Sequence, residues 1–256
     1  MVLTIFICVI AGLGAGLGTG FAGMSAAVVI SPMLITFLDM NPYEAIGIAL
    51  ASDVLASAVS AYTYGKNKNI DIKNSKWLFI SVLCFTIVGA LVAQLVPTTT
   101  MGNFTIYISL LMGINFLTKK EKHPKEPRKF KGKLKILVPI LCGAMVGFTC
   151  GFIGAGGGMM MLMLLTTVLG YELKKAVGTS VFIMTFTALF GSSSHFILEQ
   201  VVPNFLILGI CAISTLIFAL LAAKFANKAN PKVLNKATGS VLTALGIFMI
   251  VSTYLF

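Results

Sequence analysis

The sequence predicts an all-α polytopic membrane protein made of two inverted-topology repeats, each with a glycine-broken helix or re-entrant hairpin followed by three transmembrane helices. The first reason is composition: the 256 residues are 57% hydrophobic and only 11% charged, which is too apolar for a soluble domain. The second is that glycines recur in the two halves of the chain at one fixed spacing. The third is that lysine and arginine gather in a few loops between apolar stretches.

The net charge of +11 would suggest nucleic acid binding in a soluble chain. Here the basic residues lie between apolar segments, so we interpret the charge as the positive-inside rule and expect no nucleic acid partner. The five cysteines lie within apolar segments without paired or metal-type spacing, and we expect free thiols. No cleavable signal is evident, so the first span is expected to stay in the mature protein. The predicted location is a cell membrane, in a prokaryote the plasma membrane, with the lipid bilayer as a partner.

Apolar stretches near the ~20 residues that a bilayer requires predict the transmembrane helices. They cover residues 44–64, 75–96, 101–118, 174–196, 203–224 and 237–256. Two further stretches, 1–38 and 133–169, would each extend about 55 Å as one helix, nearly twice the ~30 Å hydrocarbon core. Both contain glycine clusters in the middle. Each is therefore predicted to form two short helices or a re-entrant hairpin.

An internal repeat explains why these two long stretches resemble each other. A gap-free shift of 131 residues places five residues of the first half, Gly12, Gly16, Gly20, Phe21 and Gly23, on Gly143, Gly147, Gly151, Phe152 and Gly154. Matches continue as far as Gly47 on Gly178. Glycine at five fixed offsets is hard to attribute to composition. We therefore divide the chain into a first membrane repeat (1–118), a basic cytoplasmic linker (119–135) and a second membrane repeat (136–256).

Charge in the loops predicts the orientation of the repeats. Basic residues concentrate in loops that should be cytoplasmic, at residues 65–76, 119–135 and 224–236. The loops at 97–100 and 197–203 have none and belong outside. Lys174 and Lys175 put the turn before them inside, so the path from the linker to Lys174 crosses the membrane an even number of times, as a hairpin would. The second repeat then enters from the opposite side, and both chain ends are predicted outside.

The glycine-rich stretch GFIGAGGG at 151–158 should break its helix, because glycine lacks the Cβ that keeps φ negative. At membrane depth the freed N–H groups must line protein or contact a ligand. Six regularly spaced glycines are better explained by close helix packing: Gly12, Gly16, Gly20, Gly143, Gly147 and Gly151. Three consecutive glycines exceed what packing needs, so we favour substrate contact for the rest of the cluster. The substrate-binding candidates are Gly23, Met24, Ser25, Gly154, Gly156, Gly157, Gly158, Thr179 and Ser180.

Thr179 and Ser180 are included because they begin the helix after the second hairpin and can present hydroxyl groups to the break. Their repeat mates, Ile48 and Ala49, cannot. Cys150 lies beside the break, but nothing in the sequence activates its thiol, so we do not favour a sulfur relay.

Asp53 is the one carboxylate well inside a predicted span. It begins a polar stripe at helical spacing, made of Asp53, Ser57, Ser60 and Tyr64. Because burial disfavours a charged carboxylate, Asp53 is a candidate to take up and release a proton and thereby couple transport. The alternatives are a structural helix–helix hydrogen bond for Asp53 and backbone hydrogen bonds for the serines. The stripe's repeat mate ends at His195, where an interface role is favoured over a proton relay.

These residues resemble the TauE/SafE family of membrane permeases. The resemblance covers nearly the whole chain and is carried by GFIGAGGG at 151–158, AVGTS at 176–180 and the segment that ends at His195. The first repeat has Met24 to Ala27 where the family tends to have more glycine, and the second has Met163 where the first has Pro32. The resemblance implies export or uptake of sulfite, organosulfonates and related small anions.

We therefore predict a secondary transporter or uniporter that moves a small sulfur-containing organic or inorganic anion by alternating access. The main alternative is an anion channel, which would need a continuous polar lining where we find one stripe in one half. An intramembrane enzyme is disfavoured, because there is no HExxH motif and no second intramembrane aspartate to pair with Asp53. We predict no cofactor and no metal site. Association into a homo-oligomer is left open.

Overall fold

The computed structural model describes residues 1–97, 132–154, 157–199 and 203–228, with single helical positions at 114, 236, 240, 243, 247 and 251. Eight helices have described bounds: α1 (Val2–Ala22), α2 (Ala27–Leu38), α3 (Pro42–Lys66), α4 (Ile72–Ala93), α6 (Leu134–Ile153), α7 (Gly157–Thr167), α8 (Leu173–Glu199) and α9 (Phe205–Lys228). The predicted spans at 101–118 and 237–256, and the linker as far as residue 131, lie outside the described residues apart from those single positions.

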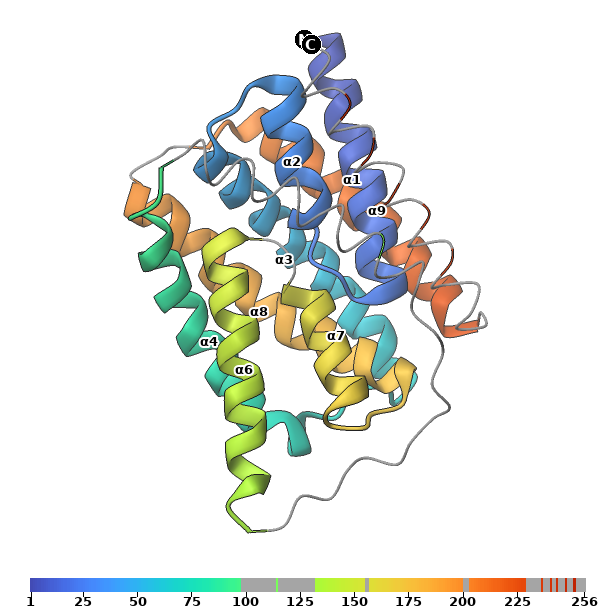
Figure 1. Ribbon diagram of the computed structural model, residues 1–256. Coiled ribbons are helices and arrows are strands. Elements are labelled where there is room, and N and C mark those ends of the chain that lie inside the picture. The colour runs from blue at the N-terminus through green and yellow to red at the C-terminus, as the bar shows by residue number, and fades with distance from the viewer. Residues whose placement is uncertain are drawn as a thin grey trace.

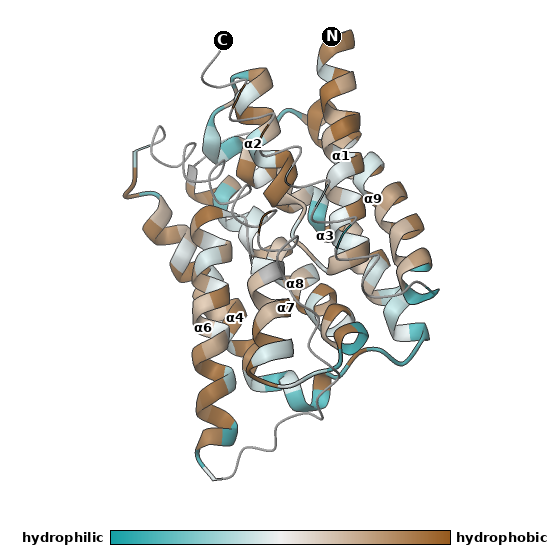
Figure 2. Cartoon of the chain, turned by 45° about the vertical axis from the view of Figure 1, so that its right-hand side comes forward, coloured by the Kyte–Doolittle hydropathy of each residue, from teal (hydrophilic) through white to brown (hydrophobic). Residues whose placement is uncertain are grey.

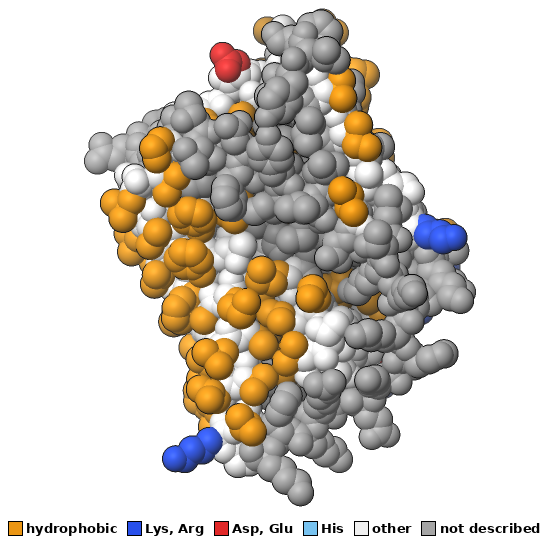
Figure 3. All heavy atoms as spheres, viewed as in Figure 1, with side chains coloured by type: hydrophobic (Ala, Val, Ile, Leu, Met, Phe, Trp, Pro, Cys, Tyr) orange, Lys and Arg blue, Asp and Glu red, His pale blue; other side chains and the backbone are white. Residues whose placement is uncertain are grey.

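Six of these helices are long and apolar enough to cross a membrane: α1, α3, α4, α6, α8 and α9. The predicted spans at 44–64, 75–96, 174–196 and 203–224 correspond closely to α3, α4, α8 and α9. Figure 2 shows hydrophobic residues along the helices and hydrophilic residues near their ends. Figure 3 shows hydrophobic side chains covering the described surface over α4 and α6. The predicted all-α, multi-pass membrane protein is therefore confirmed.

The helix ends follow from local sequence. The side chain of Asn41 accepts a hydrogen bond from Tyr43 N and Pro42 occupies the first turn, a common way to start a helix such as α3. The Asp71 carboxylate accepts a hydrogen bond from Asn74 N at 3.1 Å and starts α4 in the same manner. These caps satisfy backbone N–H groups that would otherwise lack partners at the helix start.

Each long stretch is a helical hairpin with a break at a glycine. α1 ends at Gly23 (φ 63°) and α6 ends at Gly154 (φ 69°), both in the left-handed conformation that suits glycine. The second break falls within the predicted stretch 151–158, because Gly151 still belongs to the last turn of α6 and α7 begins at Gly157. The two arms of the first hairpin differ in length. With 21 residues α1 is about 31 Å long, whereas the 12 residues of α2 span about 18 Å.

The helices of the second half recur at the predicted spacing. α6, α7, α8 and α9 each begin within two residues of the position reached by shifting α1, α2, α3 and α4 by 131. In Figure 1, α1 descends from the N-terminus, whereas α6 ascends from its first residue. The inverted insertion of the two halves into a membrane stays a prediction.

The two halves interlock through the regularly spaced glycines. α1 packs against α9 and α6 packs against α4, while α3 and α8 contact each other in the centre. A Cβ on Gly16 would lie 2.6 Å from Thr215 O of α9, and one on Gly143 would lie 2.7 Å from Leu78 O of α4. Glycine is therefore needed at both contacts, because any side chain would push the helix backbones apart. The packing role predicted for these spaced glycines agrees with this geometry.

Candidate anion site at the crossing of the two helix breaks

The two helix breaks lie against each other inside the bundle. A Cβ on Gly158, in the first turn of α7, would lie 2.8 Å from Ser25 N and would also collide with Gly23 O. Ser25 Oγ lies 3.5 Å from Gly154 O, at the limit of a hydrogen bond. Glycine at 158 therefore lets the start of α7 approach the backbone of the first break, and α2 and α7 both begin at this crossing.

Asp53 lies at the same place. The side chain is fully buried and faces Thr19 of α1, together with Ser25 and the Ala26 N–H at the start of α2. Cys150 of α6 is a further neighbour. Neither carboxylate oxygen of Asp53 has a hydrogen-bond partner among the described residues. An unpartnered carboxylate at this depth is costly, which is the usual mark of a functional group inside a membrane protein.

The first turn of α2 provides the favourable environment for that carboxylate. Free N–H groups and the helix dipole make a helix N-terminus attractive to anions. Asp53 takes this position from the neighbouring helix α3, so an anionic group that belongs to the protein already faces α2.

The other residues of the predicted polar stripe are also buried. Ser57 Oγ donates to Asp53 O at 2.5 Å within its own helix, as the structural alternative predicted. Ser60 Oγ has no partner among the described residues. Tyr64 OH donates to Gly20 O at 3.2 Å, in the last turn of α1. In the second half His195, also buried, places Nε2 3.0 Å from Gly151 O, in the last turn of α6.

Thr179 and Ser180 were both predicted to present their hydroxyl groups to the second break, and the structure places the two hydroxyl groups differently. Thr179 accepts a hydrogen bond from Asp71 N at 3.0 Å, so its hydroxyl faces the loop between α3 and α4 and does not reach the break. Ser180 donates to Val177 O, and its Oγ would lie 2.5 Å from a Cβ on Gly23. Ser180 therefore adjoins the first break. Both residues lie in the second turn of α8 or beyond, because that helix already begins at Leu173.

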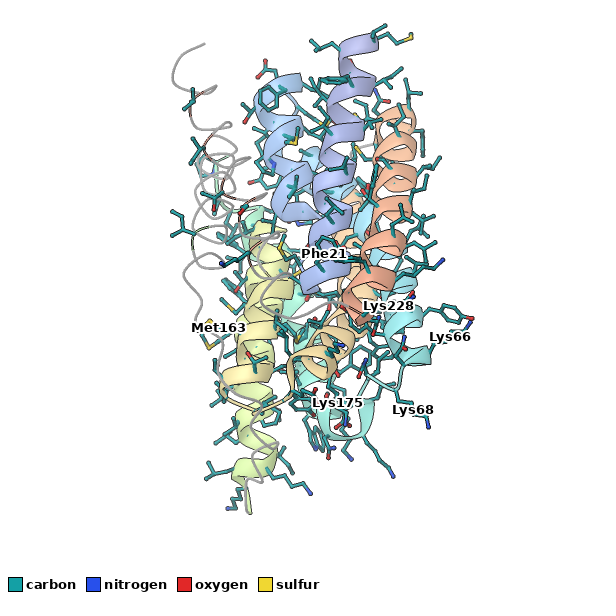
Figure 4. All side chains as sticks on the ribbon, turned by 90° about the vertical axis from the view of Figure 1, so that its right-hand side faces the viewer. Phe21, Lys66, Lys68, Met163, Lys175 and Lys228 are labelled. Carbon is teal, nitrogen blue, oxygen red and sulfur yellow. The ribbon has the colours of Figure 1, made fainter. Side chains whose placement is uncertain are left out.

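The remaining substrate-binding candidates do not all lie at the crossing of the two breaks. A Cβ on Gly157 would lie 2.8 Å from the Cβ of Cys150, which places Gly157 beside the end of α6. Met24 is buried, with its methyl group 2.6 Å from where a Cβ on Gly18 would be, so this side chain packs back on α1. Gly156 lies outside the described residues. Met163, which stands where the first half has proline, is half exposed on the outer side of α7 (Figure 4).

Sequence reasoning missed Thr19 and Cys150 as a pair. The shift of 131 residues relates them, and both adjoin Asp53, one from each half. Their relation could have been found by extending the repeat alignment to positions that differ in chemistry. All five cysteines are free thiols, as predicted.

Basic segments from both halves meet at one end of the molecule. Lys174 Nζ donates to Asn227 O at 2.8 Å, and Asn69 Nδ2 donates to Asn227 Oδ1 at 3.2 Å. Figure 4 shows four further lysines toward the same end: Lys66, Lys68, Lys175 and Lys228. This is the end predicted to be cytoplasmic, and its assignment to a side of the membrane stays a prediction.

Comparison with known families identifies the architecture. A family model described as sulfite exporter TauE/SafE matches residues 8–249, almost the entire chain and both helix breaks. The chain belongs to the TauE/SafE family. A probable membrane transporter protein of this kind from Bacillus subtilis (strain 168), YunE, is 26% identical over 217 residues, which cover 76% of this chain and 79% of YunE.

A second relative of the TauE/SafE member comes from Haemophilus influenzae. This probable membrane transporter protein is 28% identical over 197 residues, covering 77% of this chain and 74% of the relative. No solved structure matches the chain. With six apolar helices of spanning length among its described residues, the chain is a multi-pass membrane transporter of the TauE/SafE family.

Proposed function

We propose that this TauE/SafE family member is a secondary transporter or uniporter for a small sulfur-containing anion, such as sulfite or an organosulfonate, and works by alternating access. The observation that supports this most strongly is the crossing of the two breaks. Two helices, α2 and α7, begin there beside a buried carboxylate that has no hydrogen-bond partner among the described residues. Transporters with broken helices commonly hold anionic groups at such helix starts.

The first turn of α7 is the proposed seat of the transported anion. Gly157 and Gly158 begin α7, so their N–H groups have no acceptor within the helix and can bind an oxyanion once the crossing opens. The repeat mate of Asp53 is Met184, so the second half has no carboxylate of its own at the position equivalent to Asp53. A doubly charged or polar oxyanion can therefore accept hydrogen bonds from the N–H groups of α7, as the Asp53 carboxylate is placed to do at the start of α2.

Alternating access follows from how tightly the crossing is closed. Ser25, Asp53, Cys150 and Ser180 are all fully buried, and Gly158 contacts the backbone of the other break. An anion can reach α7 only if the two breaks move apart. Because each break belongs to a different half, such a movement can open the site toward one side of the membrane and close it toward the other.

Asp53 is proposed to couple anion movement to a proton. A charged Asp53 repels an anion bound at the same crossing, whereas a protonated Asp53 does not. Anion binding and protonation of Asp53 should therefore favour each other, which is a reciprocal linkage. Release of both on one side would let a proton gradient drive accumulation of the anion.

Substrate class is tested by thermal unfolding of the purified protein with sulfite, sulfate, thiosulfate, sulfoacetate or taurine. We expect at least one sulfur oxyanion to raise the apparent melting temperature, because a ligand that binds only the folded state stabilises it. Chloride at equal ionic strength is the control. If none of these compounds stabilises the protein more than chloride does, the proposed substrate class is wrong.

Coupling is tested with Asp53→Asn in proteoliposomes. The variant mimics the protonated form, so we expect it to bind the anion with little pH dependence and to exchange it across the bilayer. It should fail to accumulate the anion when an imposed pH difference is the driving force. Ser57→Ala is the control on the same helix, because Ser57 bonds only to its own helix backbone. Accumulation that persists in Asp53→Asn would exclude Asp53 as the coupling residue and favour a uniporter.

A further inference from the structure

Two hydrogen bonds in different halves of the molecule have the same spacing. Tyr64 OH donates to Gly20 O, and His195 Nε2 contacts Gly151 O; in each case the partners are 44 residues apart. Tyr64 and His195 are repeat mates under the shift of 131, and so are the two glycines. A phenol and an imidazole thus perform the same contact at equivalent places.

The two acceptors are carbonyl groups that the helices leave free. The last carbonyls of a helix have no partner within it. At the end of α1, Gly23 N bonds to Thr19 O and Met24 N bonds to Gly18 O, so neither serves Gly20 O. At the end of α6, Gly154 N bonds to Cys150 O, the carbonyl just before that of Gly151. Tyr64 and His195 therefore supply hydrogen bonds at the point where each broken helix stops.

The opposite side of each helix end is held by the other half of the chain. A Cβ on Gly20 would lie 2.6 Å from Ala219 O of α9, and one on Gly151 would lie 2.9 Å from Ala90 N of α4. Each end is thus held between a helix of the other half and a hydrogen bond from its own half. The left-handed glycines follow three residues later, so the position of these ends determines where the breaks lie.

We propose that Tyr64 and His195 are a matched pair of positioning residues that hold the ends of α1 and α6 and so place the two breaks against each other. His195 acts in this pair as a hydrogen-bond donor and not as a proton relay. A carbonyl oxygen can only accept, so Nε2 carries the hydrogen. Nε2–H is present in one neutral tautomer and in the imidazolium, so the bond does not depend on the protonation of the ring.

The test uses thiol labelling of the helix ends and does not require transport. Cys150 is buried and precedes Gly151 directly, so it reports on the end of α6 once the other four cysteines are replaced by alanine. Thr19→Cys with Cys150→Ala gives the equivalent reporter at the end of α1. Each reporter is combined with His195→Phe, His195→Tyr and Tyr64→Phe, and reacted with a small membrane-permeant maleimide.

We expect His195→Phe to raise the labelling rate of Cys150 by roughly two- to tenfold, the range expected when a single hydrogen bond that opposes local opening is lost. The cysteine at 19 should stay protected in that variant. Tyr64→Phe should show the opposite pattern. His195→Tyr should protect Cys150 as the natural histidine does, because the phenol supplies the donor that Tyr64 supplies in the first half.

Three results would overturn the proposal. These are unchanged labelling in His195→Phe, labelling that rises at both reporters at once, and failure of His195→Tyr to restore protection. The pH dependence of anion uptake provides a second readout: it should be the same for His195→Tyr as for the natural chain, and a displaced profile would assign His195 to proton transfer. If the natural chain itself binds no sulfur anion while the labelling pattern is as expected, the proposed function is wrong and the pair of positioning residues stands.

Discussion

The two helix breaks share a backbone and differ in chemistry. Both end in a left-handed glycine, with φ of 63° at Gly23 and 69° at Gly154, and both follow a helix end bonded by a side chain from the third helix of the same half. Yet the repeat mate of Asp53 is Met184. The duplicated fold therefore supplies two equivalent helix starts, but only the first half has a carboxylate at this position of its third helix.

This difference assigns separate tasks to the two halves. A symmetric site would hold two like anions close together, which electrostatic repulsion disfavours. In the proposed mechanism the first half provides a group that can change its charge, Asp53, and the second half provides glycine N–H groups for the substrate. The following predictions alter one half so that it resembles the other.

The largest effect is expected for Gly158→Ala, which gives the second half the residue of the first, because the repeat mate of Gly158 is Ala27. The new Cβ would lie 2.8 Å from Ser25 N and would also collide with Gly23 O, and backbone atoms cannot move aside as a flexible side chain can. Overpacking of this kind costs about 1–3 kcal/mol. We expect a lowered melting temperature and loss of anion binding in the thermal-shift assay.

Two variants serve as controls for that substitution. Gly209 in α9 has nothing within 4 Å of an added Cβ, so Gly209→Ala should leave both stability and binding unchanged. Ala27→Gly removes a buried methyl group from α2 and should cost only about 1 kcal/mol. If Gly158→Ala binds the anion as well as Gly209→Ala does, the close approach of the two breaks is not required for binding.

The next largest effect is expected for Met184→Asp, which places a carboxylate at the repeat mate of Asp53. By the symmetry of the fold this group should face the first turn of α7 and compete with the substrate. Two unit charges about 5 Å apart repel by ~3 kcal/mol at an effective dielectric constant of ~20. The introduced carboxylate, when charged, should therefore weaken anion binding roughly a hundredfold, measured by titration calorimetry in detergent.

Met184→Asn separates charge from the loss of a buried methionine. It has nearly the shape of the aspartate variant without the charge, so it should bind the anion much more tightly than Met184→Asp at neutral pH. Acidic pH should narrow that difference, since protonation removes the charge of the aspartate. Equal affinities for the two variants at every pH would place the anion away from α7.

The sequence predicts the course of the backbone better than it predicts the contacts of the side chains. Apolar length and glycine spacing predicted both hairpins, because a stretch of 38 residues exceeds the membrane and glycine is the residue that allows a reversal. The second break lies inside the predicted stretch 151–158, between Ile153 and Gly157. Gly151 itself remains helical, since glycine is also tolerated inside a helix, and its close contact with Ala90 N of α4 explains why glycine is present there.

The contacts of the site residues could likewise be predicted only in part from the sequence. Helical periodicity placed Asp53 and Tyr64 on one face of a helix, but the partner of each depends on tertiary contacts that periodicity does not report. Tyr64 binds the end of α1, and Asp53 faces the start of α2. Thr179 was predicted to face the break because it lies near the start of its helix. The loop between α3 and α4 uses its hydroxyl group instead, through Asp71 N.

The smallest effect is expected for Cys150→Thr, which makes the end of α6 resemble the end of α1. Thr19 donates from Oγ1 to Ala15 O at 3.0 Å, and a threonine at 150 can donate to Val146 O in the same way, so the new hydroxyl group does not stay unpaired. The two side chains have similar size, and stability should change by less than about 1 kcal/mol. Uptake of the anion should also be unchanged, since in the proposed mechanism the glycine N–H groups bind the substrate and the thiol does not react with it.

Uptake and melting temperature are measured on the same preparation, with Cys142→Thr, a change in the same helix outside the crossing, as the matched control. If Cys150→Thr folds normally but loses uptake of sulfur anions while Cys142→Thr retains it, the thiol takes part in transport. The difference between the two halves would then include sulfur chemistry as well as charge.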